Sequence, residues 1–249
     1  MPNVRHLNFV SSVVAHYETL LAPIYLWMAG GADGAFAAGA KDLEGLLGAP
    51  GIAVDLGAGF GMHAIPLARA GYRVLAIDSS QHLLAQLRLF GEGLSVESVA
   101  DDLMHFTKHL PAGKGPDLIV CMGDTLTHLP SEEAVSSLAR SVSTSLASGG
   151  RFVATFRDYS VLPTGPARFI PVRSDSDRIL TCFLESEGNT VIVHDILHER
   201  RDSQWSVRVS SYQKLRLAPA TLIQLFASYG LSVSVRPGPR GMSLLVADA

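Results

Sequence analysis

The sequence predicts a doubly wound α/β fold, in which helices cover both faces of a mostly parallel sheet. Between residues 50 and 160, short apolar runs alternate with segments whose apolar residues recur every three or four positions, as on a helix. The expected strands are residues 52–56, 72–77, 94–99, 117–121 and 151–156. The expected helices are residues 64–70, 80–90 and 132–146. Strands that are almost continuously apolar indicate a sheet buried on both sides.

The two ends of the chain have different patterns. Residues 8–48 are typical of helices, interrupted at Pro23 and at the Gly30-Gly31 pair. A loop rich in proline and glycine is expected over residues 163–171. After it, three β-rich runs predict an antiparallel meander, and the chain closes with one helix and two strands. The runs are residues 178–185, 190–198 and 205–217, and the closing elements are residues 219–229, 231–235 and 242–246.

Composition narrows the class of protein. The 249 residues are 47% hydrophobic and 17% charged, which predicts a large buried core. A net charge of −3 argues against a nucleic-acid-binding surface, and no apolar run is long enough to cross a membrane. The N-terminus does not read as a secretory signal, and two cysteines are too few for a disulfide framework. We therefore expect a cytoplasmic globular protein.

Histidine spacing raises the question of a metal site. His105 and His109 are four residues apart, as are His194 and His198, but neither pair has a nearby cysteine or third ligand in the sequence. The sequence therefore predicts no metal.

The most specific signal is a glycine-rich turn between the first strand and the first helix. It reads Asp55-Leu-Gly57-Ala-Gly59-Phe-Gly61. Glycine lets the backbone turn tightly and approach a ligand closely. Asp78 ends the second strand, where a carboxylate can accept hydrogen bonds from both hydroxyls of a ribose. Together these features predict a nucleotide-like ligand.

Two details distinguish between such ligands. A dinucleotide fingerprint has its third glycine one residue later than Gly61. The position of Gly61 therefore disfavours a nicotinamide-dependent oxidoreductase. Asp55 stands two residues before the first glycine, where it would oppose a pyrophosphate but suit an ammonium group. S-adenosylmethionine (SAM) has a ribose, an adenine, an ammonium group and a sulfonium, and no phosphate.

The glycine-rich turn resembles motif I of the class I SAM-dependent methyltransferases. Other motifs of that family follow in order: the Asp78-Ser79 pair resembles the ribose-binding end of the second strand, Asp101-Asp102 the adenine-binding turn, and residues 117–121 motif IV. In the family, the side chain at the position of Asp101 takes the exocyclic amine of adenine. The resemblance therefore implies a set of cofactor-binding residues: Asp55, Gly57, Ala58, Gly59, Asp78, Ser79, Asp101, Asp102, Cys121 and Met122.

Two further segments are similar to glycine N-methyltransferases and related small-molecule N-methyltransferases. They are residues 121–130, where the relatives read G-N-S-x-x-H-L, and residues 157–159, where they read R-N-Y. Asp124 replaces the Asn of the first motif and Asp158 that of the second, which argues against glycine as the substrate. The N-terminal segment around Tyr17 resembles the lid of many small-molecule methyltransferases.

These likenesses give the candidate residues for the acceptor. We expect Arg157 to hold an oxyanion, unless it pairs with a neighbouring aspartate, and Asp124 to attract an amine. The alternative for this pair is that Arg157 and Asp124 bind each other beside an aromatic cavity. His128 is either a general base or a structural residue that opens a helix, and Tyr17 belongs to the lid.

The resemblance implies methyl transfer from SAM, leaving S-adenosylhomocysteine (SAH), to a small polar molecule, with N-methylation of an amine favoured. Alternatives are an O- or S-methyltransferase of the same fold and a SAM- or SAH-binding module without catalysis. We expect a monomer or homodimer. The chain is predicted to be one Rossmann-like domain whose main sheet has seven strands, the last antiparallel. Its parts are a helical lid (1–48), a SAM-binding core (50–160), a β-rich insertion (163–217) and a closing helix and strand pair (218–249).

Overall fold

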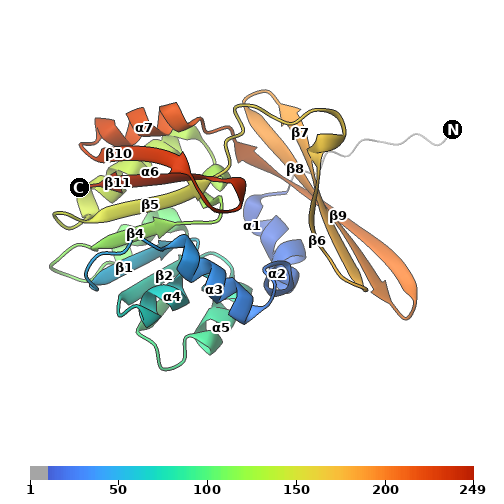
Figure 1. Cartoon of the computed structure of the whole chain (residues 1–249), viewed down its shortest axis with the longest axis horizontal. Coiled ribbons are helices and arrows are strands. Elements are labelled where there is room, and N and C mark those ends of the chain that lie inside the picture. The colour runs from blue at the N-terminus through green and yellow to red at the C-terminus, as the bar shows by residue number, and fades with distance from the viewer. Residues whose placement is uncertain (1–10) are drawn as a thin grey trace.

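The computed structural model describes residues 11–249 and contains two β-sheets that lie side by side (Figure 1). The larger sheet has seven strands in the order β10-β11-β5-β4-β1-β2-β3. All run parallel except β11, which is antiparallel to both of its neighbours. This confirms the predicted fold class. The strands are β1 (Ile52–Leu56), β2 (Arg73–Asp78), β3 (Val96–Ala100), β4 (Leu118–Cys121), β5 (Arg151–Phe156), β10 (Ser232–Pro237) and β11 (Ser243–Asp248).

Helices cover both faces of this sheet (Figure 1). On one side lie α3 (Ala32–Asp42), α4 (Ala64–Arg69) and α5 (Gln81–Phe90), and on the other α6 (Glu132–Ser145) and α7 (Pro219–Ser228). The side-chain oxygens of Ser80 and Ser131 each accept a backbone N–H of the first turn, of α5 and α6 respectively, and so fix where these helices begin.

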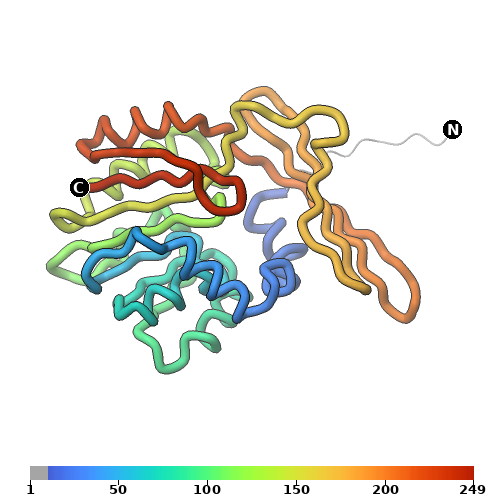
Figure 2. The backbone as a smooth tube through the Cα atoms, in the orientation of Figure 1, coloured from blue at the N-terminus to red at the C-terminus, as the bar shows by residue number. Residues whose placement is uncertain are grey.

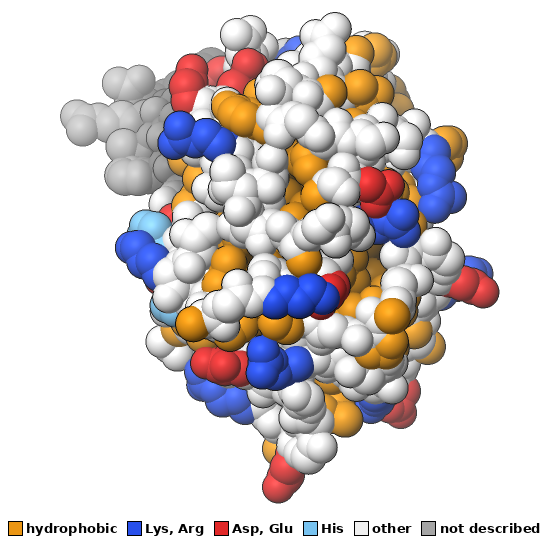
Figure 3. Space-filling model, turned by 90° about the vertical axis from the view of Figure 1, so that its left-hand side faces the viewer, with side chains coloured by type: hydrophobic (Ala, Val, Ile, Leu, Met, Phe, Trp, Pro, Cys, Tyr) orange, Lys and Arg blue, Asp and Glu red, His pale blue; other side chains and the backbone are white. Residues whose placement is uncertain are grey.

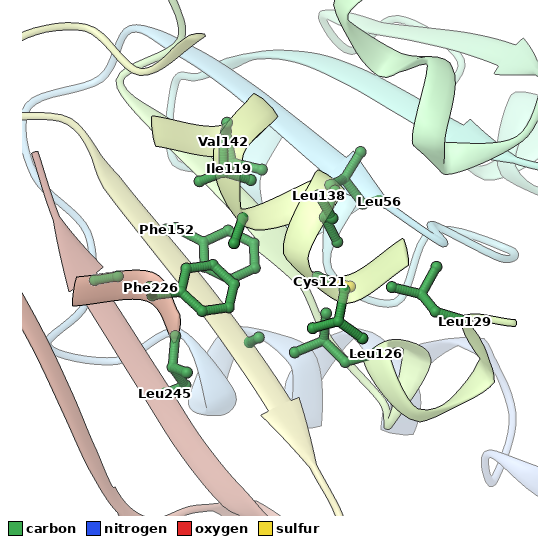
Figure 4. Close-up of a cluster of buried hydrophobic side chains, with 14 of the residues drawn as sticks. Leu56, Ile119, Cys121, Leu126, Leu129, Leu138, Val142, Phe152, Phe226 and Leu245 are labelled. Atoms are coloured by element: carbon green, nitrogen blue, oxygen red, sulfur yellow. The ribbon is translucent and has the colours of Figure 1, made fainter. Parts of the chain in front are cut away.

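The core between the sheet and helices α6 and α7 is apolar and closely packed (Figure 4). Phe152 of β5 stacks on Phe226 of α7, with ring centroids 5.1 Å apart and planes 11° apart. Both side chains are fully buried. This contact fixes α7 against β5.

Replacing Phe226 by Leu should lower the free energy of unfolding by about 1–2 kcal/mol, because the stacked pair is lost and a small void remains. Urea unfolding of Phe226→Leu measures the change. The exposed Leu89, changed to Ala, serves as the control and should have an effect below about 0.5 kcal/mol. Equal stability of Phe226→Leu and wild type would contradict the packing described.

The second sheet is an antiparallel meander of four strands in the order β6-β7-β8-β9. It contains β6 (Phe169–Ser174), β7 (Arg178–Glu187), β8 (Thr190–Arg201) and β9 (Gln204–Leu215). The sequence predicts three of these strands but assigns residues 163–171 to a loop, which is wrong for the start of β6. Proline has no backbone N–H to donate, but β6 is an edge strand with a neighbour on one side only, so Pro171 is tolerated there. A β-bulge follows Pro171.

The N-terminal segment lies between the two sheets (Figure 2). Its elements are α1 (Val13–His16), a π-helical turn (Tyr17–Leu21), a 3-10 turn (Ala22–Ile24) and α2 (Tyr25–Met28). Leu20, Leu21 and Ile24 pack on Leu180 and Leu197 of the second sheet. The part of the predicted lid that covers residues 1–10 lies outside the described residues.

The surface at the end of the molecule opposite the second sheet has acidic and basic side chains interspersed (Figure 3). Among the described residues, no helix combines the length and hydrophobicity needed to span a membrane.

Candidate functional site

A cavity of about 290 Å³ opens at the carboxyl ends of β1, β2 and β4. The strand order reverses here, since the chain proceeds from β1 toward β3 on one side and from β4 toward β5 on the other. Ligands of open α/β sheets bind at such a reversal. Loops after the strands form one wall (residues 57–60, 78–80, 102–103 and 122–123), and the N-terminal segment forms another with Val13, Val14, Tyr17, Glu18 and Tyr25.

The glycine-rich turn forms part of the floor of this cavity. Gly57 and Gly59 have φ angles of 78° and 55°, in the region that favours glycine. A Cβ atom on Gly57 would lie 2.7 Å from Cγ2 of Thr125, so the turn packs tightly on the loop after β4. On Gly59 the only neighbour would be Cδ1 of Leu83 at 3.8 Å, so the space above Gly59 is open to a ligand.

Asp78 lies at the end of β2 and lines the cavity. Its Oδ2 accepts the Gly59 N–H at 2.8 Å, and its Oδ1 accepts the Ser80 N–H at 2.8 Å. Burial raises the pKa of this carboxyl above its usual range, although the two backbone hydrogen bonds oppose the rise. The carboxylate therefore fixes the glycine turn, and each oxygen retains a lone pair for a ligand.

Asp55 lies behind the cavity lining rather than in it. Its side chain is fully buried, and its Oδ2 has no hydrogen-bond partner among the described residues. Burial raises the pKa of Asp55 to about 6, even though His63 lowers it. A buried carboxylate with a free oxygen is suited to a cationic group bound nearby.

Asp55 also predicts a pH dependence of stability. Its pKa in the folded chain is about 6 and the ordinary value is 3.8, so the folded state binds more protons between these values and loses stability as pH rises through them. Asn cannot ionise. The free energy of unfolding of Asp55→Asn, minus that of wild type, should therefore rise by about 2 kcal/mol as pH is raised from 4.5 to 7.5. Urea unfolding without ligand at the two pH values measures this change. A stability difference that does not change with pH would contradict the buried, unpaired carboxyl.

The two aspartates after β3 face different environments. Asp101 does not line the cavity: its oxygens bond to His105 Nδ1 at 2.9 Å and His109 Nε2 at 2.8 Å. Asp102 does line it, and its Oδ1 accepts the Met104 N–H. Asp101, expected to take the exocyclic amine of adenine, thus has two histidines of the following turn as partners in this structure. Among residues 11–249, no three His, Cys, Asp or Glu side chains are arranged to hold a metal.

Asp124 and Arg157 are the two residues that the sequence predicts to face the acceptor. Neither lines the cavity. Asp124 is buried, with its Oδ2 2.5 Å from Lys214 Nζ and its Oδ1 accepting the backbone N–H of Arg157 at 2.7 Å. The Arg157 residue is exposed. The two residues are thus linked through a backbone hydrogen bond, and the charge of Asp124 is balanced by a lysine that the sequence analysis did not consider.

Tyr17 and His128 both line the cavity, with ring centroids 5.5 Å apart. The His128 Nε2 has no partner among the described residues. Burial, reinforced by the charges of Lys214 and His16, lowers the pKa of His128 well below its usual range. The ring is therefore neutral at pH 7 and can accept a hydrogen bond or a proton.

Of the remaining predicted residues, Ala58, Ser79 and Met122 line the cavity and Cys121 does not. Cys121 is the last residue of β4, and its side chain lies in the core, where burial raises the pKa of the thiol (Figure 4). The Cys121 side chain therefore lies outside the cavity that the predicted cofactor residues Ala58, Ser79 and Met122 line.

Sequence reasoning missed Glu18 and His63 as lining residues. Glu18 follows Tyr17 in the π-helical turn, which is a local geometry that periodicity does not reveal. With Glu18, Asp78 and Asp102, the lining contains three carboxylates, and it contains no Lys or Arg among the described residues. This charge balance suits a cationic ligand and disfavours a pyrophosphate.

Residues 53–150 match the family model described as a methyltransferase domain. A curated relative, glycine N-methyltransferase of Rattus norvegicus, is 29% identical over 151 residues, which are 55% of this chain and 52% of the relative. The chain thus spans about half the length of the curated relative it matches.

Solved structures resemble more than nine-tenths of the chain. The CcbJ methyltransferase from Streptomyces caelestis has a TM-score of 0.76 at 21% identity, covering 94% of this chain and 97% of that one. DesVI from Streptomyces venezuelae has a TM-score of 0.72 at 19% identity, covering 93% and 99%. The amino pentose methyltransferase CalS10 from Micromonospora echinaspora, solved with SAM bound, has a TM-score of 0.70 at 16% identity, covering 92% and 96%. The chain therefore has the fold of these methyltransferases, and its residues 53–150 match the methyltransferase-domain family.

Proposed function

We propose that this protein transfers a methyl group from SAM to a small-molecule acceptor. The observation that carries the proposal is the cavity at the strand-order reversal, with the open glycine turn, Asp78 beside it and a lining that has carboxylates but no Lys or Arg. Asp78 would hold the ribose, residues 102–103 the adenine and the glycine turn the amino-acid end, with Asp55 behind it. When bound, SAM supplies an electrophilic methyl group on a sulfonium.

The acceptor end of the cavity supports an amine as the methylated group. Tyr17, Tyr25 and His128 line this end. The neutral His128 ring can accept the proton that a neutral amine loses as its nitrogen forms the bond to the methyl group and the methyl–sulfur bond breaks. The similarity to a glycine N-methyltransferase and to an amino pentose methyltransferase supports the same choice. The alternatives are O- or S-methylation and a module that binds SAM without catalysis.

Calorimetry with SAH, SAM and NAD tests the cofactor. We expect a dissociation constant for SAH on the order of micromolar and no binding of NAD, because the lining has no cation to pair with a pyrophosphate. Tight binding of NAD, or no binding of either SAM or SAH, would refute the proposal. Incubation of the chain with SAM and a panel of small amines, alcohols and thiols, followed by mass spectrometry, identifies the methylated atom. Methylation only of alcohols or thiols would refute the choice of an amine.

Asp78→Ala should weaken SAH binding by about 1.5–3 kcal/mol, since it removes a charged acceptor and releases the Gly59 N–H that fixes the turn. Asp158→Ala is the matched control. Its Oδ1 accepts the N–H two residues on, as that of Asp78 does, but it is exposed and outside the cavity lining. Calorimetry should find SAH affinity lost in Asp78→Ala and kept in Asp158→Ala. Equal SAH affinities of the two variants would mean that Asp78 does not contribute to the cofactor site.

A further inference from the structure

Lys214 is a buried cation that the cofactor and acceptor sites do not explain. It lies near the end of β9, in the second sheet, and its side chain is almost completely buried. Its Nζ is 2.5 Å from Asp124 Oδ2 and lies 5.8 Å from the centre of the Tyr159 ring and 5.6 Å from that of Tyr212. Burial alone would lower the pKa of Lys214, but the adjacent Asp124 carboxylate outweighs this and raises it. Lys214 therefore remains protonated.

Its partner Asp124 is the hydrogen-bonding centre of the turn after β4. Besides Lys214, the carboxylate accepts the Arg157 N–H at 2.7 Å and the Tyr159 hydroxyl at 3.4 Å. The backbone of Asp124 is left-handed, with φ at 77°, and its carbonyl accepts from both the N–H and the hydroxyl of Thr127. The Asp124 side chain thus holds a strained residue in place between β5 and β9.

The turn that Asp124 holds supplies one side of the cavity. Met122 and Gly123 precede Asp124, and Thr125 and His128 follow it; all four line the cavity. Because Asp124 is buried, its charge needs a partner, and Lys214 is the cation that the structure provides. The position of His128 therefore depends on a lysine from the other sheet.

We propose that Lys214 is a positioning residue for the acceptor end of the cavity, which fixes the turn of residues 122–128 through Asp124 and sets the electrostatic environment of His128. The inference deepens the proposed function, since it concerns the residue that would receive the acceptor's proton. It explains why Asp124 can stand where the similar N-methyltransferases have Asn, because Lys214 neutralises the added charge.

The charge of Lys214 acts on His128 directly. After burial, it is the largest influence that lowers the pKa of this histidine. Polar and titratable groups lie around the His128 ring on each element packed against it. The N-terminal segment supplies Tyr17 and His16, and His16 in turn contacts Asp195 of β8. Strand β9 supplies Tyr212 and Lys214, and Asp124 belongs to the turn that contains His128. Lys214 is the group in this set whose removal would most favour protonation of His128.

Lys214→Met tests the inference, with the protonation of His128 followed by NMR as pH is lowered, in the absence of ligand. The His128 signal is assigned by its loss in His128→Gln. We expect the midpoint of His128 in Lys214→Met to rise by at least about one pH unit, because a nearby cation is removed and the Asp124 carboxylate is left unpaired.

Two further variants separate positioning from stability. Lys114→Met also removes a lysine whose Nζ lies 2.5 Å from an aspartate oxygen, but this pair is on the surface, so the His128 midpoint should not change. The double variant Lys214→Met with Asp124→Asn should recover most of the thermal stability lost in Lys214→Met, while the His128 midpoint stays above that of wild type.

A His128 midpoint equal to that of wild type in Lys214→Met, with only the melting temperature lowered, would overturn the inference and leave Lys214 a purely structural residue. Should the single variant fail to fold, the same midpoint in the double variant as in wild type would overturn it. Failure of the wild-type chain to bind SAH would refute the proposed function without affecting the NMR comparison, because the titrations are done without ligand.

Discussion

Gly59→Val should abolish SAH binding while leaving the protein folded. A side chain on Gly59 would extend into open space in which only Leu83 comes within 4 Å, and that space is the cavity over the glycine turn. The valine methyl groups would occupy the volume proposed for the cofactor. We expect the affinity to fall by more than about a hundredfold, equivalent to more than about 2.7 kcal/mol. Calorimetry with SAH, together with far-UV circular dichroism, measures binding and folding.

Part of the effect of this substitution is backbone strain, since φ at Gly59 is 55°. Gly149→Val is the matched control. Gly149 has φ at 73° and open space around a Cβ atom, and it precedes β5, at the end of the strands away from the cavity. It should lose comparable stability and keep its affinity for SAH. If Gly59→Val binds SAH as wild type does, the cofactor does not lie over this turn.

His128→Gln should lower the rate of methylation of the amine found in the panel by about a hundredfold or more, the usual contribution of a general base. Gln fills a similar volume and can still accept a hydrogen bond, but it cannot take a proton near pH 7. The affinity for SAH should change little, because the cofactor is proposed to contact the turns after β1 and β2. The turnover number and the SAH dissociation constant are the two quantities to measure.

His194→Gln is the control for this change. His194 also makes side-chain hydrogen bonds, to Ser211 and Glu185, but it belongs to β8 and does not line the cavity. Its turnover should match that of wild type. A His128→Gln protein with undiminished turnover would show that alignment of the reactants suffices, and that His128 is structural.

The main sheet could be predicted because its signals are local. Each parallel strand is a short apolar run followed by a helix, and in such a chain the strands form one sheet with helices on both faces. The edge strand β6 was missed because Pro171 and its neighbours read as a loop, and only the position of β6 at the edge makes a proline acceptable there.

The sequence by itself determined the cofactor end of the site. Gly57, Gly59 and Asp78 follow two consecutive parallel strands, so chain order places them at one edge of the sheet, and their residue types indicate a ribose and a close backbone approach. Local geometry still decided one detail, because His105 and His109 hold the Asp101 side chain outside the cavity lining.

Only the tertiary structure decided the acceptor end. Asp124 and Lys214 are 90 residues apart, and His16 and Asp195 are 179 apart, so no local pattern reveals that these buried pairs attach the second sheet to the turn and to the N-terminal segment. A carboxylate that looks available in the sequence is thus neutralised in the fold. Whether a charged side chain meets a ligand or another residue depends on which distant elements pack against it, and this is settled only when the two sheets are in place.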